Sequence, residues 1–399
     1  MTISTSAAPE ASARTARTHD DMIRVAHELA ESIRPIARQA ELDRKPDDGV
    51  IQQARDSGLF DLMSPRQYGG AELDLDTFFE VSLILGEADT SHGWVLSFYI
   101  EHVWMFCQFP EEFQRELFAD RSYVLAPGAL AATGRAAQSS DGYHLSGRWP
   151  WGTGIMHADW VLAGAVRELP NGQTDVGFFA LPVEDTTYED TWNVDGMCAT
   201  GSNDILVTDK IVPANRVVSI PEMLNADAPG SLIHAGPLYR TPMAPILSFT
   251  AALPVLGQAK AALKEFNAQL AGRKDRSGIA QSERVDRQEL VGRVALDLAA
   301  AESLLRDVLR DVMHQRGSAN EATRVRWTTS IGHAVHVARR GIDALCDTAG
   351  AGAHRLDNPL QRARRDANTA ACHMVFDMSA RYQAFGRTIL DQPAASTWH

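Results

Sequence analysis

The chain has 399 residues, of which 45% are hydrophobic, and its 38 basic and 51 acidic side chains give a formal net charge of −13. This length fits two or three packed units with large cores. The acidic balance argues against nucleic acid or an anionic membrane as the main partner. The 4 cysteines show no Cys-x-x-Cys spacing, so they indicate neither a zinc site nor a disulfide framework, and they fit a reducing cytoplasm.

The amino-terminal part of the chain predicts a short tail followed by helices. Residues 1–18 are rich in Ala, Ser and Thr without a continuous apolar core, which predicts a disordered tail and not a signal peptide. No apolar run is expected to reach the length that spans a bilayer. The spacing of apolar residues predicts helices over 20–44, 49–57 and 76–89, and another that begins near Thr90. These helices define an expected domain over 19–123.

The middle of the chain changes to short β-prone runs separated by Gly, Pro and Asp. The runs are YHLSGRW, DWVLAGAV, DVGFFALPV and DILVTDKIV. Regular short strands with turn signals predict a small barrel or sandwich between helical blocks, assigned to residues 124–235. Beyond it, long amphipathic patterns with short connections predict a four-helix bundle over 236–399, with helices over 243–271, 283–316, 320–350 and 358–390.

The stretch SGRWPWGTGIMHADW, residues 146–160, could hold a planar ring. Trp149 and Trp151 lie two residues apart, which places them on one face of an extended strand. Gly152 and Gly154 flank Thr153, and glycines allow a ring to approach the backbone while the hydroxyl bonds a ring nitrogen. On pattern alone, a tight hairpin with two half-buried tryptophans is the simpler interpretation.

Ordered motifs from about residue 20 to 390 resemble the acyl-CoA dehydrogenase superfamily. They are a Gly-Leu, a Pro and a Tyr-Gly-Gly over 58–70, the Trp-x-Thr at 151–153, GMCATGSNDILVTDKIVPANRV over 196–217, and Gly-x-Gly, Pro and Arg-Asp over 347–373. The resemblance implies a mostly α fold in which an N-terminal helical domain, a central small β-barrel and a C-terminal four-helix bundle follow one another.

The superfamily contains dehydrogenases and flavin monooxygenases, and the two need different groups. A dehydrogenase requires a carboxylate base, yet His373 occupies the commoner base position and no Asp or Glu occurs over 228–264. The resemblance therefore favours a monooxygenase. Such an enzyme takes reduced flavin, FMNH2 or FADH2, from an NAD(P)H-dependent flavin reductase and forms a C4a-hydroperoxide with O2, which hydroxylates a phenolic or polycyclic aromatic substrate.

More narrowly, the chain resembles the oxygenase components of two-component phenol hydroxylases, including the steroid-catabolic one and those of aromatic polyketide pathways. Further matching pieces are HGWV at 92–95, ATGSND at 199–204 and RDA with a His seven residues after its Asp. By helical spacing Asp377 lies one turn after His373, where it could orient the imidazole or merely cap a salt bridge. The resemblance implies catalysis by His373, with Thr153 at flavin N5. It implies these further flavin neighbours: Trp94, Ala126, Pro127, Gly128, Trp151, Gly152, Ala351, Gly352 and Met374.

Two further roles follow from the resemblance. Arg273 is expected to bind a flavin phosphate across a subunit interface, which goes with a homotetramer. Trp94, Phe98 and His102, at four-residue steps, are expected to line the substrate pocket, although core packing alone explains such a face.

Three other functions stay open at this point. The chain could oxidise the nitrogen of an amino sugar or another amine, since relatives with this fold do so. It could be an acyl-CoA dehydrogenase with a displaced base, or a flavin-free bundle that serves as a scaffold. The residues do not separate FMN from FAD, because the expected ring contacts are common to both.

Overall fold

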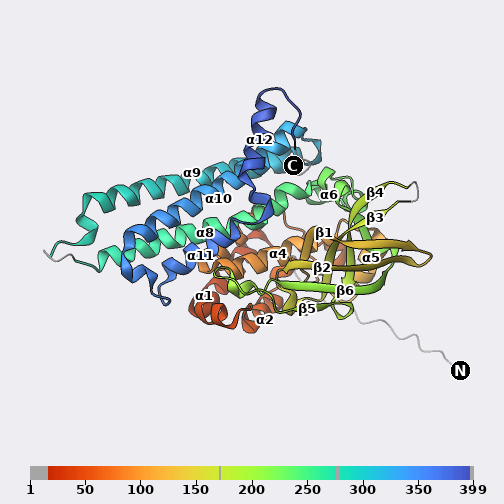
Figure 1. Cartoon of the computed structure of the whole chain (residues 1–399), viewed down its shortest axis with the longest axis horizontal. Coiled ribbons are helices and arrows are strands. Elements are labelled where there is room, and N and C mark those ends of the chain that lie inside the picture. Colours follow the sequence, from red (N-terminus) through yellow and green to blue (C-terminus); the bar gives the residue numbers. More distant parts are fainter. Residues whose placement is uncertain (1–16, 170–171, 275–277, 396–399) are drawn as a thin grey trace, which may run out of the picture.

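The computed structural model describes residues 17–169, 172–274 and 278–395. Figure 1 shows helices of the amino-terminal part, a β-sheet, and long helices that extend away from the sheet. Residues 1–16 of the expected tail lie outside the described residues. Thr18 belongs to the first helix, because its hydroxyl accepts a hydrogen bond from the Asp21 amide and caps the helix.

The amino-terminal helices form where the spacing of apolar residues predicts them. They are α1 (His19–Asp43), α2 (Asp48–Ser57), α3 (Leu75–Ala88) and α4 (Thr90–Phe106), followed by α5 (Glu111–Leu117). Every residue of α4 is buried, whereas a helix at a protein surface keeps one polar face. The side chains of α4 therefore meet other protein segments on all sides.

The central strands form one sheet. They are β1 (Gly128–Ser139), β2 (Gly142–Gly152), β3 (Trp160–Glu168), β4 (Thr174–Pro182), β5 (Thr187–Glu189), β6 (Asn203–Val212) and β7 (Val217–Ser219). Their order is β5-β6-β2-β1-β3-β4-β7, and neighbouring strands are antiparallel except β1 with β3. The four β-prone runs are confirmed in β2, β3, β4 and β6. The runs quoted above do not include β1, whose GALAATGRAAQS sequence is mostly small residues.

One expectation about β2 is wrong. Trp149 is fully buried, while Trp151 is 65% exposed, so the two rings do not share a face. The cause is local, because the backbone of Trp151 adopts φ 66° and the pairing with β6 shifts between Trp149 and Gly152. An irregularity of this kind interrupts the strict alternation of a strand and re-aims a side chain.

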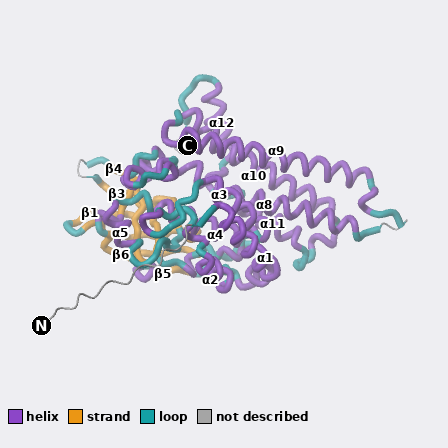
Figure 2. The backbone as a smooth tube through the Cα atoms, turned by 180° about the vertical axis from the view of Figure 1, so that it is seen from behind, coloured by secondary structure: helices purple, strands orange, loops and turns teal. Residues whose placement is uncertain are grey.

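The carboxyl-terminal helices pack side by side, as Figures 1 and 2 show. Two short helices, α6 (Ile220–Asn225) and α7 (Pro229–Ile233), lead into them. The long ones are α8 (Met243–Ala271), α9 (Val285–Gln315) and α10 (Glu321–Ala349), and then come α11 (Pro359–Ala370) and α12 (Met378–Ile389). The first three expected bundle helices are confirmed.

The expected single helix over 358–390 is wrong, because a turn over 371–377 separates α11 from α12. Val375 and Phe376 in this turn are buried, and Asp377 caps α12 by accepting a backbone hydrogen bond. Burying the two apolar side chains draws the chain toward the core. As a result, α12 does not continue α11, and it packs against α10 at the top of Figure 1.

Helix α8 corrects the expectation that no apolar run is long enough to cross a bilayer. Among the described residues it is the one helix that is long and apolar enough by length and composition, but 78% of its most apolar window is buried inside the fold. Packing against α3, α4 and α10 accounts for this composition, as in other core helices.

Gly257 allows α8 to approach α3 closely. A Cβ at this position would lie 2.4 Å from the Leu83 carbonyl oxygen and 2.7 Å from the Glu87 amide nitrogen. We expect Gly257→Ala to lower the free energy of unfolding by about 3 kcal/mol, because two backbones must separate. Gly292→Ala in α9 is the control, since nothing lies within 4 Å of its added Cβ and alanine favours a helix by about 0.5–1 kcal/mol. Urea unfolding of both variants checks the difference, and equal stability would contradict it.

Candidate active site

Three rings on α4 meet the imidazole of His373, which comes from the turn over 371–377. Trp94 and Phe98 pack with centroids 4.9 Å apart, and both contact the imidazole of His373, at 5.6 Å and 6.2 Å. The ring centroid of His102 lies 5.4 Å from that of Phe98, so Trp94, Phe98 and His102 form an aromatic row. The structure thus brings the expected pocket residues together with the expected catalytic histidine, although it packs them against one another.

The imidazole of His373 has a defined hydrogen-bonding pattern. Its Nδ1 lies 3.4 Å from the Val375 amide and accepts that hydrogen bond, so in the neutral ring the proton is on Nε2. The ring is partly exposed, yet enough protein surrounds it to lower the pKa of His373 to about 4, because burial disfavours the charged form. His373 is therefore uncharged at neutral pH and offers one N–H donor.

Asp377 does not orient His373 as the helical spacing suggests. The two residues are not on one α-helix, since His373 precedes and Asp377 follows the short 3-10 helix Met374–Phe376. The carboxylate of Asp377 accepts a hydrogen bond from the Ala380 amide at 3.2 Å. Asp377 is thus a helix cap of α12, and the expectation that it orients His373 is wrong.

His102 rests on the segment Ala126 to Gly128, as expected for neighbours of one site. Its Nδ1 donates to the Ala126 carbonyl oxygen at 2.6 Å, and a Cβ added to Gly128 would lie 2.7 Å from its Nε2. Between them, the Pro127 carbonyl accepts from the Leu162 amide in β3. The glycine therefore makes room for the imidazole.

Glu101 is a buried carboxyl that sequence reasoning missed, although it is the one acidic residue of α4. Within the described part of the chain neither carboxyl oxygen has a hydrogen-bond partner; His102 Nε2 lies 3.3 Å from Oε2 but is not aligned for one. Burial raises the pKa of Glu101 to about 8 and lowers the pKa of His102 to about 4, because both charged forms lose hydration. The pair is uncharged near neutral pH, with the proton on Glu101.

The turn after β2 presents a hydroxyl and an aromatic ring. Thr153 is partly exposed, and its hydroxyl lies 3.0 Å from that of Ser202. Trp151 is 65% exposed and Met374 48% exposed. A non-glycine residue at positive φ, such as Trp151, stores backbone strain, which is concentrated at functional sites. An exposed indole two residues from a hydroxyl fits the ring of a flavin, which needs an apolar face and a hydrogen bond at its edge.

The expected phosphate partner lies elsewhere in the chain. Arg273 Nη1 donates to the Ala349 carbonyl oxygen at 3.1 Å, and a Cβ on Gly352, next to Ala351, would lie 3.3 Å from Arg273 Nη2. The 12 residues of α11, about 18 Å of helix, separate this loop from the turn that carries His373. Within one chain, Arg273 therefore lies apart from the turn that carries His373.

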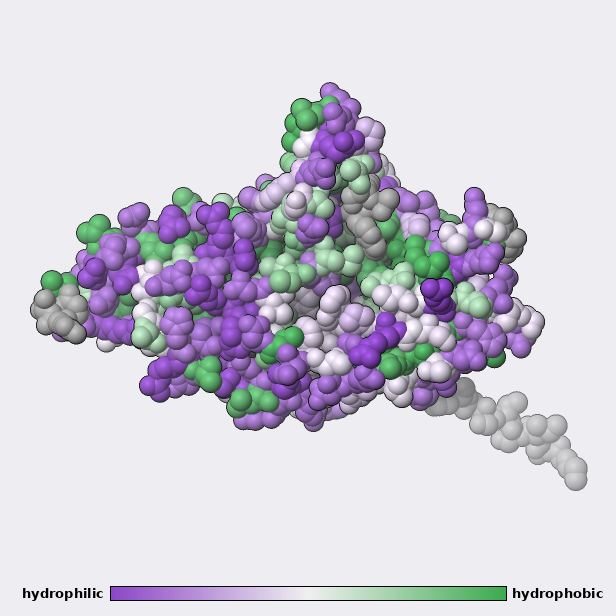
Figure 3. All heavy atoms as spheres, in the orientation of Figure 1, coloured by the Kyte–Doolittle hydropathy of each residue, from purple (hydrophilic) through white to green (hydrophobic). Residues whose placement is uncertain are grey.

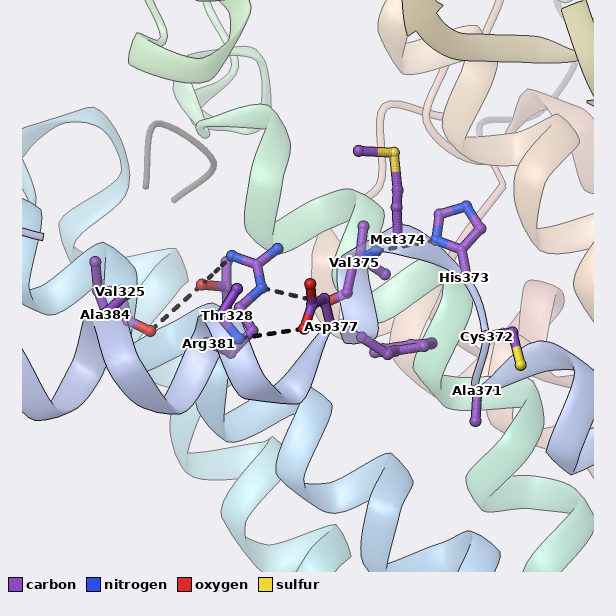
Figure 4. A pocket seen from close by; sticks show the side chains of 12 residues that line it. Val325, Thr328, Ala371, Cys372, His373, Met374, Val375, Asp377, Arg381 and Ala384 are labelled. Carbon is purple, nitrogen blue, oxygen red and sulfur yellow. Dashed lines mark hydrogen bonds between the residues drawn. The ribbon is translucent and has the colours of Figure 1, made fainter. Parts of the chain in front are cut away.

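A cavity of about 640 Å³ opens beside His373, a size typical of small-molecule sites. Figure 4 shows His373 and Met374 on one side of it and Thr328 and Arg381 on the other. Its lining comes from α10, the turn over 371–377 and α12. Trp94, Phe98 and His102 do not line it. The break between α11 and α12 therefore creates a hollow that the expected continuous helix would have filled.

Comparison with known proteins identifies this fold. Models of the acyl-CoA dehydrogenase N-terminal domain and C-terminal domain match residues 17–121 and 249–378. A pigment production hydroxylase of Rhodococcus sp. (strain ATCC 21145) is 32% identical over 95% of this chain and 98% of its own. The oxygenase component of an FADH(2)-dependent resorcinol hydroxylase of Rhizobium sp. (strain MTP-10005) is 31% identical over 91% of this chain and 92% of its own.

Solved structures agree with these relatives. The HsaA monooxygenase of Mycobacterium tuberculosis superposes with a TM-score of 0.90 and 26% identity over 96% of this chain and all of its own. XiaF from Streptomyces sp., solved with FADH2 and glycerol, superposes with a TM-score of 0.87 and 28% identity, over 95% of this chain and 97% of its own.

The fold and the two matching domains define a protein with the acyl-CoA dehydrogenase fold. Within this fold, the chain belongs to the family of oxygenase components of two-component flavin-dependent monooxygenases.

Proposed function

We propose that this oxygenase hydroxylates a phenolic or polycyclic aromatic ring with reduced flavin and O2. The observation that carries the proposal is the neutral His373 between the aromatic row and the cavity. The acid that a dehydrogenase needs is absent from this position, and an N–H donor stands there instead. Two relatives named above, the pigment production hydroxylase and the resorcinol hydroxylase, support a ring as the substrate.

The chemistry of the exposed groups suits a flavin. Trp151 and Met374 would flank its ring, Thr153 would bond its N5 edge, and Arg273 of another copy would pair with its phosphate. Bound in reduced form, the flavin supplies the electrons that activate O2 for transfer to the substrate. The same contacts serve FMN and FAD, and the structure of XiaF with FADH2 supports FAD.

His373 acts on the substrate in this proposal. Its Nε2–H donates to the phenolic oxygen and stabilises negative charge there, which increases electron density on the ring. Because the imidazole stays neutral at working pH, this donor does not depend on protonation. Trp94 and Phe98 hold the imidazole in place by ring contacts and keep water from its far side.

The partners follow from the two-component system. A separate flavin reductase supplies the reduced flavin, and we propose that it uses NAD(P)H and that the pair works in the cytoplasm. We also propose a homotetramer. Apolar side chains of α12 are exposed in one chain, Tyr382 by 45% and Ile389 by 66%, and Figure 3 shows further apolar surface at the foot of this helix. A second copy would cover such a surface.

Product analysis tests the reaction class. The purified chain, a flavin reductase, NADH and flavin are incubated with a panel of phenols, polycyclic phenols and amines under 18O2. Mass spectrometry is expected to find one 18O atom on a ring carbon of a phenolic substrate. Oxygen found only on the nitrogen of amines would overturn ring hydroxylation and favour the N-oxygenase.

A further inference from the structure

Three hydroxyl groups form a chain that starts at the expected N5 contact. Thr153 Oγ1 lies 3.0 Å from Ser202 Oγ, which lies 2.7 Å from Thr200 Oγ1. Thr200 Oγ1 in turn lies 2.9 Å from the Met197 carbonyl oxygen. Thr200 and Ser202 are buried, so solvent does not compete for their hydrogen bonds.

The direction of this chain follows from counting protons. A carbonyl oxygen only accepts, so Thr200 donates its single hydroxyl proton to Met197. Ser202 must then donate to Thr200, and Thr153 must donate to Ser202, because each hydroxyl carries one proton. The Thr153 oxygen consequently has no proton left for a ligand and presents only lone pairs.

The end of this hydrogen-bond chain at Met197 is held by further hydrogen bonds. The Met197 amide donates to Asp366 in α11 at 2.6 Å, and the indole of Trp192 donates to the Met197 carbonyl oxygen at 2.9 Å. The Gly154 amide donates to the Thr200 carbonyl at 3.1 Å, which ties the Thr153 turn to the same segment. A hydroxyl whose partners are fixed in this way has one preferred rotamer and one polarity.

The hydrogen-bonding direction of Thr153 matters for flavin binding, because flavin N5 changes between donor and acceptor. The N5 atom of reduced flavin carries a hydrogen and donates, whereas N5 of oxidised flavin has a lone pair and accepts. We infer that Thr200 and Ser202 fix Thr153 as an acceptor, so that the site prefers flavin with hydrogen on N5 and disfavours oxidised flavin. The inference rests on the proposed flavin site and makes Thr200 and Ser202 positioning residues that touch no flavin.

Anaerobic binding measurements test this hydroxyl relay of Thr200, Ser202 and Thr153. Dissociation constants of FMN and FAD are measured in the oxidised form and after reduction with dithionite, by absorbance and fluorescence titration. The wild-type chain is expected to bind reduced flavin at least about tenfold more tightly, the ratio that one hydrogen bond of about 1.4 kcal/mol gives.

The decisive variant is Thr200→Val. Without the Thr200 hydroxyl, Ser202 can donate to Thr153, and Thr153 can donate to oxidised N5. The preference for reduced flavin is expected to fall about tenfold, mainly through tighter binding of oxidised flavin. Thr200→Ser keeps the hydroxyl and should keep the wild-type ratio. Thr250→Val is the matched control, because Thr250 is equally buried and also donates to a backbone carbonyl, that of Ile246.

The outcomes separate the relay from the proposed function. An unchanged ratio in a folded Thr200→Val chain overturns the relay and leaves the oxygenase function in place. Wild-type chain that binds oxidised flavin as tightly as reduced flavin overturns it as well. Wild-type chain that binds neither form overturns the flavin site itself. Should Thr200→Val not fold, Ser202→Ala replaces it, since it also releases the Thr153 proton and predicts the same lower ratio.

Discussion

The His373→Ala variant is expected to lose hydroxylation by a factor of at least about 100, while reduced flavin is still oxidised and O2 is still reduced to hydrogen peroxide. The alanine removes the imidazole N–H donor that His373 places beside the cavity, so charge on the phenolic oxygen is no longer stabilised. The flavin contacts assigned to Trp151 and Thr153 are untouched. Binding and oxidation of flavin therefore continue without transfer to substrate.

Two variants control this experiment. His373→Gln retains a side-chain N–H and should recover part of the coupling, measured as hydroxylated product per flavin oxidised. His144→Ala, at a partly exposed histidine of β2, should couple like the wild-type chain. If His373→Ala also shows wild-type coupling, its assigned role is wrong.

Replacing Glu101 with glutamine should stabilise the protein at alkaline pH. The pKa of Glu101 is raised from 4.5 to about 8, so the folded chain retains a proton that the unfolded chain releases between these values. Stability of the wild-type chain accordingly falls as pH rises through this window. Glutamine has no proton to lose, so its advantage starts near pH 4.5 and reaches a few kcal/mol near pH 8.

Thermal unfolding at pH 5 and pH 8 measures this difference. The melting temperature of Glu101→Gln should exceed that of the wild-type chain by several degrees at pH 8 and by little at pH 5. Glu112→Gln, at an exposed residue of α5, should change neither. His102 is the titratable neighbour, and its lowered pKa keeps it neutral over this range. An advantage that is larger at pH 5 would contradict the buried, protonated state of Glu101.

Much of the fold was predictable because its patterns are local. Apolar spacing marks α1 to α4 and α8 to α10, and β-prone composition marks β2, β3, β4 and β6. The prediction of one continuous last helix was wrong for a physical reason. Val375 and Phe376 continue the apolar pattern in the sequence, but their burial breaks the helix. The predicted direction of the Trp151 side chain was also wrong, because a positive φ at a non-glycine residue depends on tertiary pairing and leaves no local signal in the sequence.

The candidate site was predictable only in part. Resemblance pointed to His373, Thr153 and the row on α4, and the structure gathers the row around His373. Glu101 and the Thr200–Ser202 relay were missed, because their importance depends on burial and on contacts between residues far apart in the sequence. The separation of Arg273 from the ring-binding residues is likewise a property of helix length in three dimensions.

Anaerobic titration with reduced FMN and FAD, followed by rapid mixing with oxygenated buffer, tests the central claim most directly. The account predicts that reduced flavin binds and that an absorbance transient, distinct from both reduced and oxidised flavin, persists after mixing. Tight binding of oxidised FAD with no transient would contradict it, and the chain would then have to be tested with acyl-CoA substrates as a dehydrogenase.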